Sequence, residues 1–461
     1  MKNLFVSAGL VALGAAALQS AAASPASPKY WNVSATLRGF YDDNYNINPS
    51  SKGSGGIEFS PSVSFHVPLQ QTDLGLRYTY GLYYYQDRQD LGVNAFDQTH
   101  QLDLWVDHAF NERWHAKVTD TFAAGQEPEL LQPNPATGQS IQRRINGDNY
   151  ANYGLVSLST DWTRLFSTVL TYNNSLYDYN NSGAQVDPFY GSSPYLSLSN
   201  PGNGFGGNWQ YLNGGPSLAG ILDRVEEGVA LDFKWHLQPE TTVFVGYKFS
   251  WVNYTGNEPI AVINYEYQGN VSDQRAFVYH SSDRDSVTHY GYVGIEHQFT
   301  SNLGAMVRGG ASYTDSYNDP LFPTTSWAPY ADVSLQYTYI PGSYVQLGFT
   351  HDINATDQVQ PDSSGHLTQY AESSVVYLDI NHRITPKLIA TAIGRVQYST
   401  YQGGVASSSD ETGYGLGFNL NYRINQHFAV DAGYNYDNLT TTLAGAGYTR
   451  NRVYLGLSAN Y

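Results

Sequence analysis

The chain has 461 residues, a formal net charge of −17 at pH 7 and no cysteine. The lack of cysteine excludes disulfide bonds and thiolate metal sites. The negative charge argues against nucleic acid as a partner, since phosphate binding depends mainly on Lys and Arg. Aromatic residues make up 15% of the chain, which suits β-strands and membrane-interface girdles.

The N-terminus has the pattern of a secretory signal peptide. Lys2 supplies a positive charge, residues 4–18 form an apolar stretch, and three alanines before Ser24 provide small residues for cleavage. A transmembrane anchor is the alternative, but it needs about 20 apolar residues and this stretch is shorter. We therefore predict that residues 1–23 are a signal peptide and that residues 24–461 are the exported protein.

The exported part contains many segments in which apolar residues alternate with polar or small ones. Alternate side chains of a strand point to opposite faces, so each segment has one apolar face. Each segment has about the 9–11 residues that a tilted strand needs to cross a bilayer. The clearest stripes begin at Val33, Leu74, Leu102, Val229, Val243, Val333, Tyr414, Phe428 and Val453.

The connections between these segments alternate in length. Short turns are predicted at residues 68–72, 111–113, 160–164, 238–241, 300–302, 341–343, 385–387 and 425–427. Longer loops rich in Gly, Ser, Asn and Asp lie between them. Short periplasmic turns that alternate with long external loops are the pattern of a transmembrane barrel.

We therefore predict an all-β fold, a transmembrane antiparallel up-and-down β-barrel that forms one domain. About 18 strands are expected, or 16 if one hairpin is miscounted, with both termini periplasmic. The count is weakest between Ala151 and Tyr172, where alternation is poor. A soluble β-sandwich, propeller or solenoid would also alternate, but it would not explain the rhythm of the loops.

The last ten residues are the most informative segment. Their apolar face resembles the C-terminal assembly signal of bacterial outer-membrane barrels, which implies the barrel-assembly machinery as a partner. A strand of this kind with an open edge would be an aggregation hazard, so we expect it to close the sheet. The residues of this face are Val453, Leu455, Leu457, Ala459 and Tyr461.

Two connections are long, at about residues 176–222 and 256–283. Loops of this length in a compact structure are usually functional. Each could fold into the barrel and narrow it, or shield its outer rim. Ile260 to Tyr267 could form a short extra strand.

If the apolar stripes face lipid, the intervening residues face the interior. Charges of both signs fall there in similar number. Asp120 and His108 are exceptions, which we expect near strand ends. The charged residues predicted to line the interior are Arg38, Arg77, Asp103, Asp107, Lys117, Asp232, Lys234, Lys248, Glu296, Arg308, Asp332, Asp379, Arg383, Arg395, Arg423, Asp431 and Arg452.

This mixed interior has two interpretations. It could wet a pore that passes hydrophilic solutes with little selectivity, or its charges could pair and hold a filled barrel together. Wall side chains alone cannot fill a barrel of about 18 strands, which favours the pore. Surplus acids in the loops, such as Asp42 and Asp43, could bind divalent cations shared with lipopolysaccharide or form a solvated surface.

No catalytic motif is present. We find no G-x-S-x-G, H-E-x-x-H or P-loop, and the 12 His residues are never at metal-ligand spacing. We expect no enzyme activity, no cofactor and no metal site.

Four N-terminal segments resemble the putative β-barrel porin 2 family. They are ATLRGFYDDNYN (residues 35–46), GGIEFSPSVSFHVP (55–68), DLGLRYTYGLYYYQD (73–87) and HQLDLWVDHAFNERWHAKVTDTF (100–122). The resemblance implies an outer-membrane pore, sometimes associated with exopolysaccharide export, and gives no ligand residues. We expect a channel for passive passage of hydrophilic solutes. The alternatives are an exopolysaccharide export pore and a structural or adhesive barrel with a plugged interior.

Overall fold

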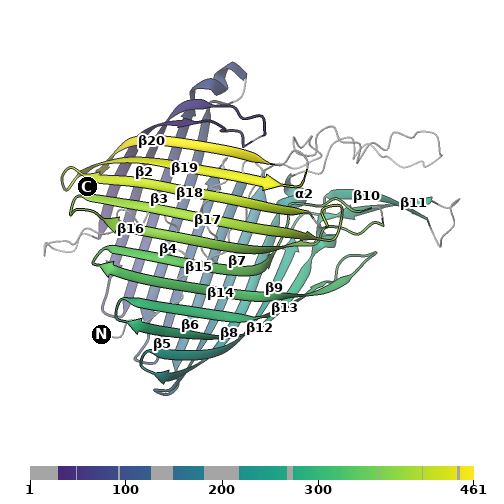
Figure 1. Ribbon diagram of the computed structural model, residues 1–461, viewed down its shortest axis with the longest axis horizontal. Helices are drawn as coiled ribbons and strands as arrows, with labels where there is room; N and C mark the ends of the chain where they lie inside the picture. Colours follow the sequence, from purple (N-terminus) through teal and green to yellow (C-terminus); the bar gives the residue numbers. More distant parts are fainter. Residues whose placement is uncertain are drawn as a thin grey trace.

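The computed structural model describes residues 30–47, 49–91, 94–125, 149–180, 218–266, 274–362, 364–407, 409–443 and 447–461. Its main element is one antiparallel sheet of 18 strands (Figure 1). The first nine strands are β1 Trp31–Asp42, β2 Ser54–Pro68, β3 Thr72–Tyr85, β4 Phe96–Ala109, β5 Trp114–Gly125, β6 Asn149–Asp161, β7 Phe166–Tyr179, β8 Arg224–Gln238 and β9 Thr241–Tyr254. The other nine are β12 Ser286–Thr300, β13 Leu303–Ser316, β14 Thr324–Ile340, β15 Ser343–Asn354, β16 Tyr370–Arg383, β17 Leu388–Gln402, β18 Asp410–Arg423, β19 Phe428–Thr441 and β20 Tyr448–Asn460.

The sheet closes on itself. Each strand pairs with its sequence neighbours, β9 pairs with β12, and β1 pairs with β20 from Ser34 opposite Asn460 to Asp42 opposite Arg452. Val33 and Tyr461 exchange two further backbone hydrogen bonds at the end of this seam. The predicted all-β barrel and its count of 18 strands are confirmed, and the last strand closes the sheet as expected.

The eight predicted short turns are all present, and all lie at one end of the barrel, which we call the turn rim. Their sequences explain several of them. The side-chain oxygens of Asn111 and Asn425 accept hydrogen bonds from backbone N–H groups two and three residues further on. Pro341 and Gly342 join β14 to β15, with Gly342 at φ 83°, the conformation that the third residue of a type II turn needs. The C-terminus lies at this rim (Figure 1).

The opposite end, the loop rim, carries the longer connections. They include the 3-10 helices η1 (Gln86–Leu91) and η5 (Ser281–Arg284), the short helix α2 (Leu218–Leu222), and a hairpin of β10 (Pro259–Glu266) with β11 (Gln274–His280). The hairpin projects beyond the barrel (Figure 1). It confirms the extra strand expected at 260–267. Residues 1–23 and most of the 176–222 loop lie outside the described residues.

The region of poor alternation forms two regular strands, β6 and β7. The pattern is weak because β6 carries Asn152 and Gly154 on the face that is apolar elsewhere, and Leu155 on the opposite face. Strand pairing here is set by the neighbouring strands, so it does not require a continuous apolar stripe.

Candidate functional site: the inner face of the barrel

The predicted lining residues share one face of the sheet. Arg38 on β1 lies opposite Glu58 on β2 and Gly456 on β20, and it also reaches Asp431 on β19, two strands away. Side chains converge in this way on the concave side of a closed sheet, so this is the inner face. The register places on it Arg38, Arg77, Asp103, Asp107, Lys117, Asp232, Lys234, Lys248, Glu296, Arg308, Asp332, Asp379, Arg383, Arg395, Arg423, Asp431 and Arg452. That these residues line a pore stays a prediction.

The opposite face of the sheet is apolar in its middle and aromatic at both ends. Exposed residues of its middle band include Leu37, Val63, Leu102, Leu170, Val245, Val293, Val307, Leu347, Val376, Leu416 and Leu455. Exposed aromatic residues near the turn rim include Trp31, Phe65, Phe110, Trp162, Trp235, Phe299, Tyr422, Phe428 and Tyr461. Those nearer the loop rim include Tyr41, Phe96, Tyr150, Trp327, Tyr398 and Tyr414. An apolar band between two aromatic girdles is the surface of a transmembrane barrel.

One row of inner-face side chains crosses the closing seam. Arg38 Nη1 donates to Glu58 Oε1 at 3.1 Å, and its Nε donates to Asp431 Oδ2 at 2.6 Å. The second contact passes over Gly456, where a Cβ would lie 2.4 Å from Arg38 Cγ. The glycine therefore provides the space through which β1 and β19 are joined by an ion pair.

A second row crosses strands on the far side of the barrel. Tyr292 Oη on β12 donates to Asp232 Oδ1 on β8 at 2.7 Å, over Gly246 on β9. Close by, Lys234 Nζ donates to Glu296 Oε1 at 2.7 Å, also across β9. In both rows, side chains of alternate strands meet over the strand between them.

The predicted lining residues differ in their partners. Arg77 pairs with Asp103, and His115 pairs with Asp107. Tyr344 donates to Asp379, and Arg395 donates to Gln397. Lys117 lies opposite Asp107 in register, and Asp332 lies opposite Arg308. Arg383 and Arg423 are the last residues of β16 and β18, at the turn rim and away from the central rows.

Many inner-face cations lie against aromatic rings. Arg452 is 4.5 Å from the Phe40 ring centroid, and Lys248 is 4.5 Å from that of Tyr290. Across the described ranges, these contacts fall in two sectors, one around β20 to β3 and one from β7 to β13, each with its adjoining loops. The sectors face each other, since β1 and β12 are nine steps apart in the 18-stranded ring. The other contacts join Arg38 with Tyr454, Arg452 with Tyr83, Arg88 with Tyr45 and Tyr85, Arg224 with Tyr177, Lys234 with Phe244, Arg284 with Tyr254, and Arg308 with Phe244 and Tyr292.

Several ion pairs of the inner face and the loop rim were not predicted from the sequence. Arg450 and Asp42 form a buried ion pair between β20 and β1, so Asp42 is not a solvated acid of the rim. Arg88 on η1 pairs with Asp97 on β4 at 2.6 Å. Alternation alone could have placed Arg450 beside Arg452 on the inner face, but no sequence signal shows which acid it meets.

The two predicted exceptions on the outer face differ. His108 is next to the end of β4, as expected, and its Nδ1 lies 2.8 Å from Thr72 Oγ1. Asp120 is in the middle of β5, so the expectation that it lies near a strand end is wrong. Further charged or ionisable outer-face residues that the sequence analysis missed include Glu227, His351 and Glu372.

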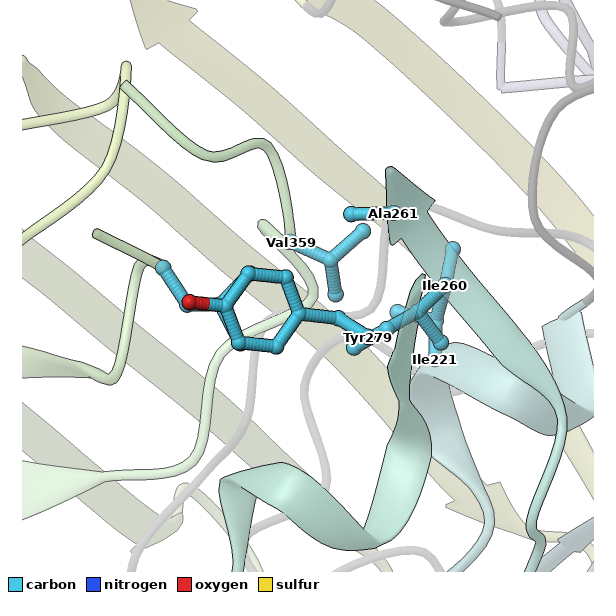
Figure 2. Close-up of a cluster of buried hydrophobic side chains, with 6 residues drawn as sticks. Ile221, Ile260, Ala261, Tyr279 and Val359 are labelled. Atoms are coloured by element: carbon cyan, nitrogen blue, oxygen red, sulfur yellow. The ribbon is translucent and has the colours of Figure 1, made fainter. Parts of the chain in front are cut away.

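A folded cap stands at the loop rim. Ile221 of α2, Ile260 and Ala261 of β10, and Tyr279 of β11 pack with Val359 and Leu367 in one buried cluster. Figure 2 shows the Tyr279 ring below Val359. Ile221 and Ile260 lie near the backbone end of the Tyr279 side chain, away from its hydroxyl group. Tyr279 Oη donates to the Gly365 carbonyl at 2.9 Å. These contacts join α2, the β10–β11 hairpin and the described residues 355–362 and 364–369.

Arg284 and Asp223 link the cap to the barrel. Arg284 donates to the carbonyls of Ile221 and Thr356 and lies over the Tyr254 ring. Asp223 accepts a hydrogen bond from the Tyr179 backbone N–H at 2.8 Å. Burial, aided by neighbouring carboxylates, raises the pKa of Asp223 to about 7.

The final strand has the geometry that its sequence predicts. Val453, Leu455, Leu457 and Tyr461 are exposed on the outer face, and β20 is paired on both sides. Its role as an assembly signal stays a prediction. Within the described part of the chain, no group of three or more His, Asp or Glu side chains is placed to hold a metal ion. No helix described here has the length and apolar character needed to cross a membrane.

A closed barrel with an apolar outer band and a charged inner face is the architecture of porins. A family model described as putative beta-barrel porin 2 matches residues 211–461, more than half of the chain. The chain belongs to this family. This β-barrel porin is therefore an outer-membrane protein, and the predicted family is confirmed. The N-terminal segments that suggested the family lie outside the matched residues, so the family pattern is carried by α2 and β8 to β20.

Several solved structures of outer-membrane proteins are similar to the chain over most of its length. OccAB4 of Acinetobacter baumannii is 10% identical, with 95% of this chain and 100% of that chain covered and a TM-score of 0.41. OpdK of Pseudomonas aeruginosa is 8% identical, with 94% and 99% covered and a TM-score of 0.41. A BenF-like porin from Pseudomonas fluorescens Pf-5 is 10% identical, with 94% and 99% covered and a TM-score of 0.39. No curated protein matches the chain.

Proposed function

We propose that this porin is an outer-membrane channel through which hydrophilic solutes pass passively. The observation that carries the proposal is a closed sheet of 18 strands whose inner face bears paired charges of both signs. Barrels of 16–18 strands are wide enough to leave an aqueous channel. A charged and hydrogen-bonding wall keeps such a channel wet.

The charge pairs indicate weak ion selectivity. Arg38 forms ion pairs with two carboxylates. Lys234 and Arg77 each form an ion pair with one carboxylate. A strong ring of one sign would be needed to select cations or anions. The same balance argues against a dedicated exporter of an anionic polysaccharide, which would need a mainly basic wall.

The proposed orientation follows from the two rims. The turn rim, where β1 begins and β20 ends, would face the periplasm, and the loop rim with its cap would face outwards, as in bacterial barrels with short periplasmic turns. The acidic loops would then meet lipopolysaccharide. The barrel would pass solutes and would carry out no catalysis.

Liposome swelling tests the proposal. The refolded protein, reconstituted into liposomes, should admit neutral sugars at rates that fall with sugar size. Heat-denatured protein is the control. A folded barrel, shown by its heat-dependent mobility in SDS gels, that admits no sugar would contradict the proposal and favour a plugged structural barrel.

A further inference from the structure

Asp120 is a carboxylate on the outer face of the barrel, halfway along β5. Its register neighbours on that face are Leu104 on β4 and Gly154 on β6. Asp120 is therefore at the depth of the apolar band. Asp120 takes no part in the inner face or in the cap.

Asp120 belongs to a small polar group, which we call the outer polar patch: Asp120, Asn152, Gly154 and Asn174. Asn152 Nδ2 donates to Asp120 Oδ1 at 2.9 Å. Gly154 lies between Asp120 and Asn174 in register. A Cβ at Gly154 would be 3.5 Å from Asp120 Oδ2 and 4.0 Å from Asn174 Cβ, so the glycine leaves a shallow recess between two polar side chains.

The row continues towards the loop rim. Glu227 on β8 is the register neighbour of Asn174. Its carboxylate accepts hydrogen bonds from Tyr172 Oη at 2.6 Å and Trp251 Nε1 at 2.5 Å. Glu227 is thus held by its own barrel in the aromatic girdle, whereas Asp120 lies deeper and has one hydrogen bond in the described part of the chain, the bond from Asn152.

The depth of the patch restricts what can meet it. In the hydrocarbon region neither water nor a lipid headgroup is at hand to solvate a carboxylate, and a polar group without a partner there is costly. Charged residues on the lipid face of barrels destabilise most at the bilayer midplane. A protein surface with hydrogen-bonding groups at the same depth would remove this cost.

We propose that the outer polar patch is a contact surface between two copies of this chain. The patch carries both acceptors, on Asp120, and amide donors, on Asn152 and Asn174. A two-fold axis near Gly154 would bring Asp120 of each copy to an amide of the other, and a self-complementary surface of this kind is what a symmetric pair requires. The missing side chain at Gly154 lets the two walls approach closely, as small residues do between membrane segments.

Site-directed cross-linking tests this proposal directly, because the chain has no cysteine. Val156 lies on the outer face of β6 beside the patch, and Val376 lies on the outer face of β16 on the opposite wall. Their exposures are 43% and 44%. Val156→Cys and Val376→Cys are therefore a matched pair for a short bifunctional maleimide, applied to the full-length protein in its membrane.

The proposal predicts a cross-linked band of twice the chain mass with Val156→Cys and none with Val376→Cys. No band with either variant, or equal bands with both, would overturn it. A Val156→Cys band at a mass other than twice that of the chain would also overturn it, since the patch would then meet a different protein.

A second variant tests the patch itself. In the Val156→Cys background, Asp120→Leu with Asn174→Leu should remove most of the double-mass band, while heat-dependent mobility in SDS gels shows that the barrel still folds. The same two substitutions should leave sugar entry into liposomes unchanged, which separates this proposal from the channel. A folded variant that keeps the full band would contradict the proposed role of the patch.

Discussion

At the scale of single residues, the closing seam depends on a glycine. Gly456 allows Arg38 to pass from β1 over β20 to Asp431 on β19. A side chain here would overlap with Arg38 Cγ and approach Asp431 Oδ1, which are 2.4 and 3.0 Å from the position of a Cβ.

We therefore expect Gly456→Ala to displace Arg38 from Asp431 and to destabilise the barrel by about 1–3 kcal/mol, the usual cost of overpacking. The measurement is the temperature at which the folded band is lost in SDS gels. Gly39→Ala on β1 is the matched control, because a Cβ there meets nothing within 4 Å. Equal effects of the two substitutions would contradict the role given to Gly456.

Arg38 itself should affect ion selectivity. Arg38→Gln leaves Glu58 and Asp431 without their shared cation on the inner face, so we expect the channel to become more selective for cations. The reversal potential in a salt gradient measures this change. Arg38→Lys keeps the charge and should retain most of the original value. An unchanged reversal potential in a conducting Arg38→Gln channel would place Arg38 outside the ion path.

The sequence predicts the face of these residues but not their partners. Alternation in β1 and β19 is enough to place Arg38 and Asp431 on the inner face. Their ion pair also depends on the register of β20 against both strands, and it joins residues 393 positions apart. Nothing local in the sequence encodes that register, and the Asp42–Arg450 pair was missed for the same reason.

At the scale of elements, the short turns were the most predictable parts. Asn111, Asn425 and the Pro341–Gly342 pair carry their turn geometry in their own side chains or φ angles. The cap was less predictable, since its cluster joins segments that are far apart in the chain. The sequence indicated only an extra strand near Ile260.

The cap should depend on pH through Asp223. Its folded-state pKa of about 7 is above the ordinary value of 3.8, mainly because of burial, with contributions from Asp178 and Glu258. The neutral carboxyl is thus favoured in the folded cap, whereas the opened cap ionises with the ordinary pKa. The stability of the folded cap therefore falls as the pH rises from about 4 to about 7. Exchange protection of amides in 218–223, corrected for intrinsic rates, should fall over this range and level off above it.

Asp223→Asn should make that protection nearly independent of pH, because the amide cannot ionise. The hydrogen bond from the Tyr179 N–H can still be accepted by the amide oxygen. A variant whose protection falls with pH as in the original chain would show that another group controls the cap.

The cap core gives a further prediction. Ile260→Ala removes a buried side chain that packs with Ile221 and Tyr279, and such truncations cost about 2–5 kcal/mol. Limited proteolysis should then cut residues 355–369 faster, while the barrel keeps its heat stability. A loss of barrel stability as large as that of the cap would contradict the cap as a separate packing unit.

At the scale of the whole molecule, the fold could be predicted because the two faces of the sheet contact different solvents. The alternation of apolar residues, the alternation of loop lengths and the pattern of the final strand each predict the same closed sheet. The outer polar patch is where the pattern fails, since Asp120 and Asn174 interrupt the apolar band, and sequence reasoning misplaced Asp120 at a strand end. The folding of the long connections into a cap depends on non-local contacts, which periodicity does not encode.

The proposed channel must conduct ions. Single-channel recording of the refolded protein in a planar bilayer, with the reversal potential in a salt gradient, measures this conduction. We predict stable current steps with weak ion selectivity. Absence of steps from a properly folded barrel, both in the full chain and in a variant lacking residues 181–217, would contradict the channel.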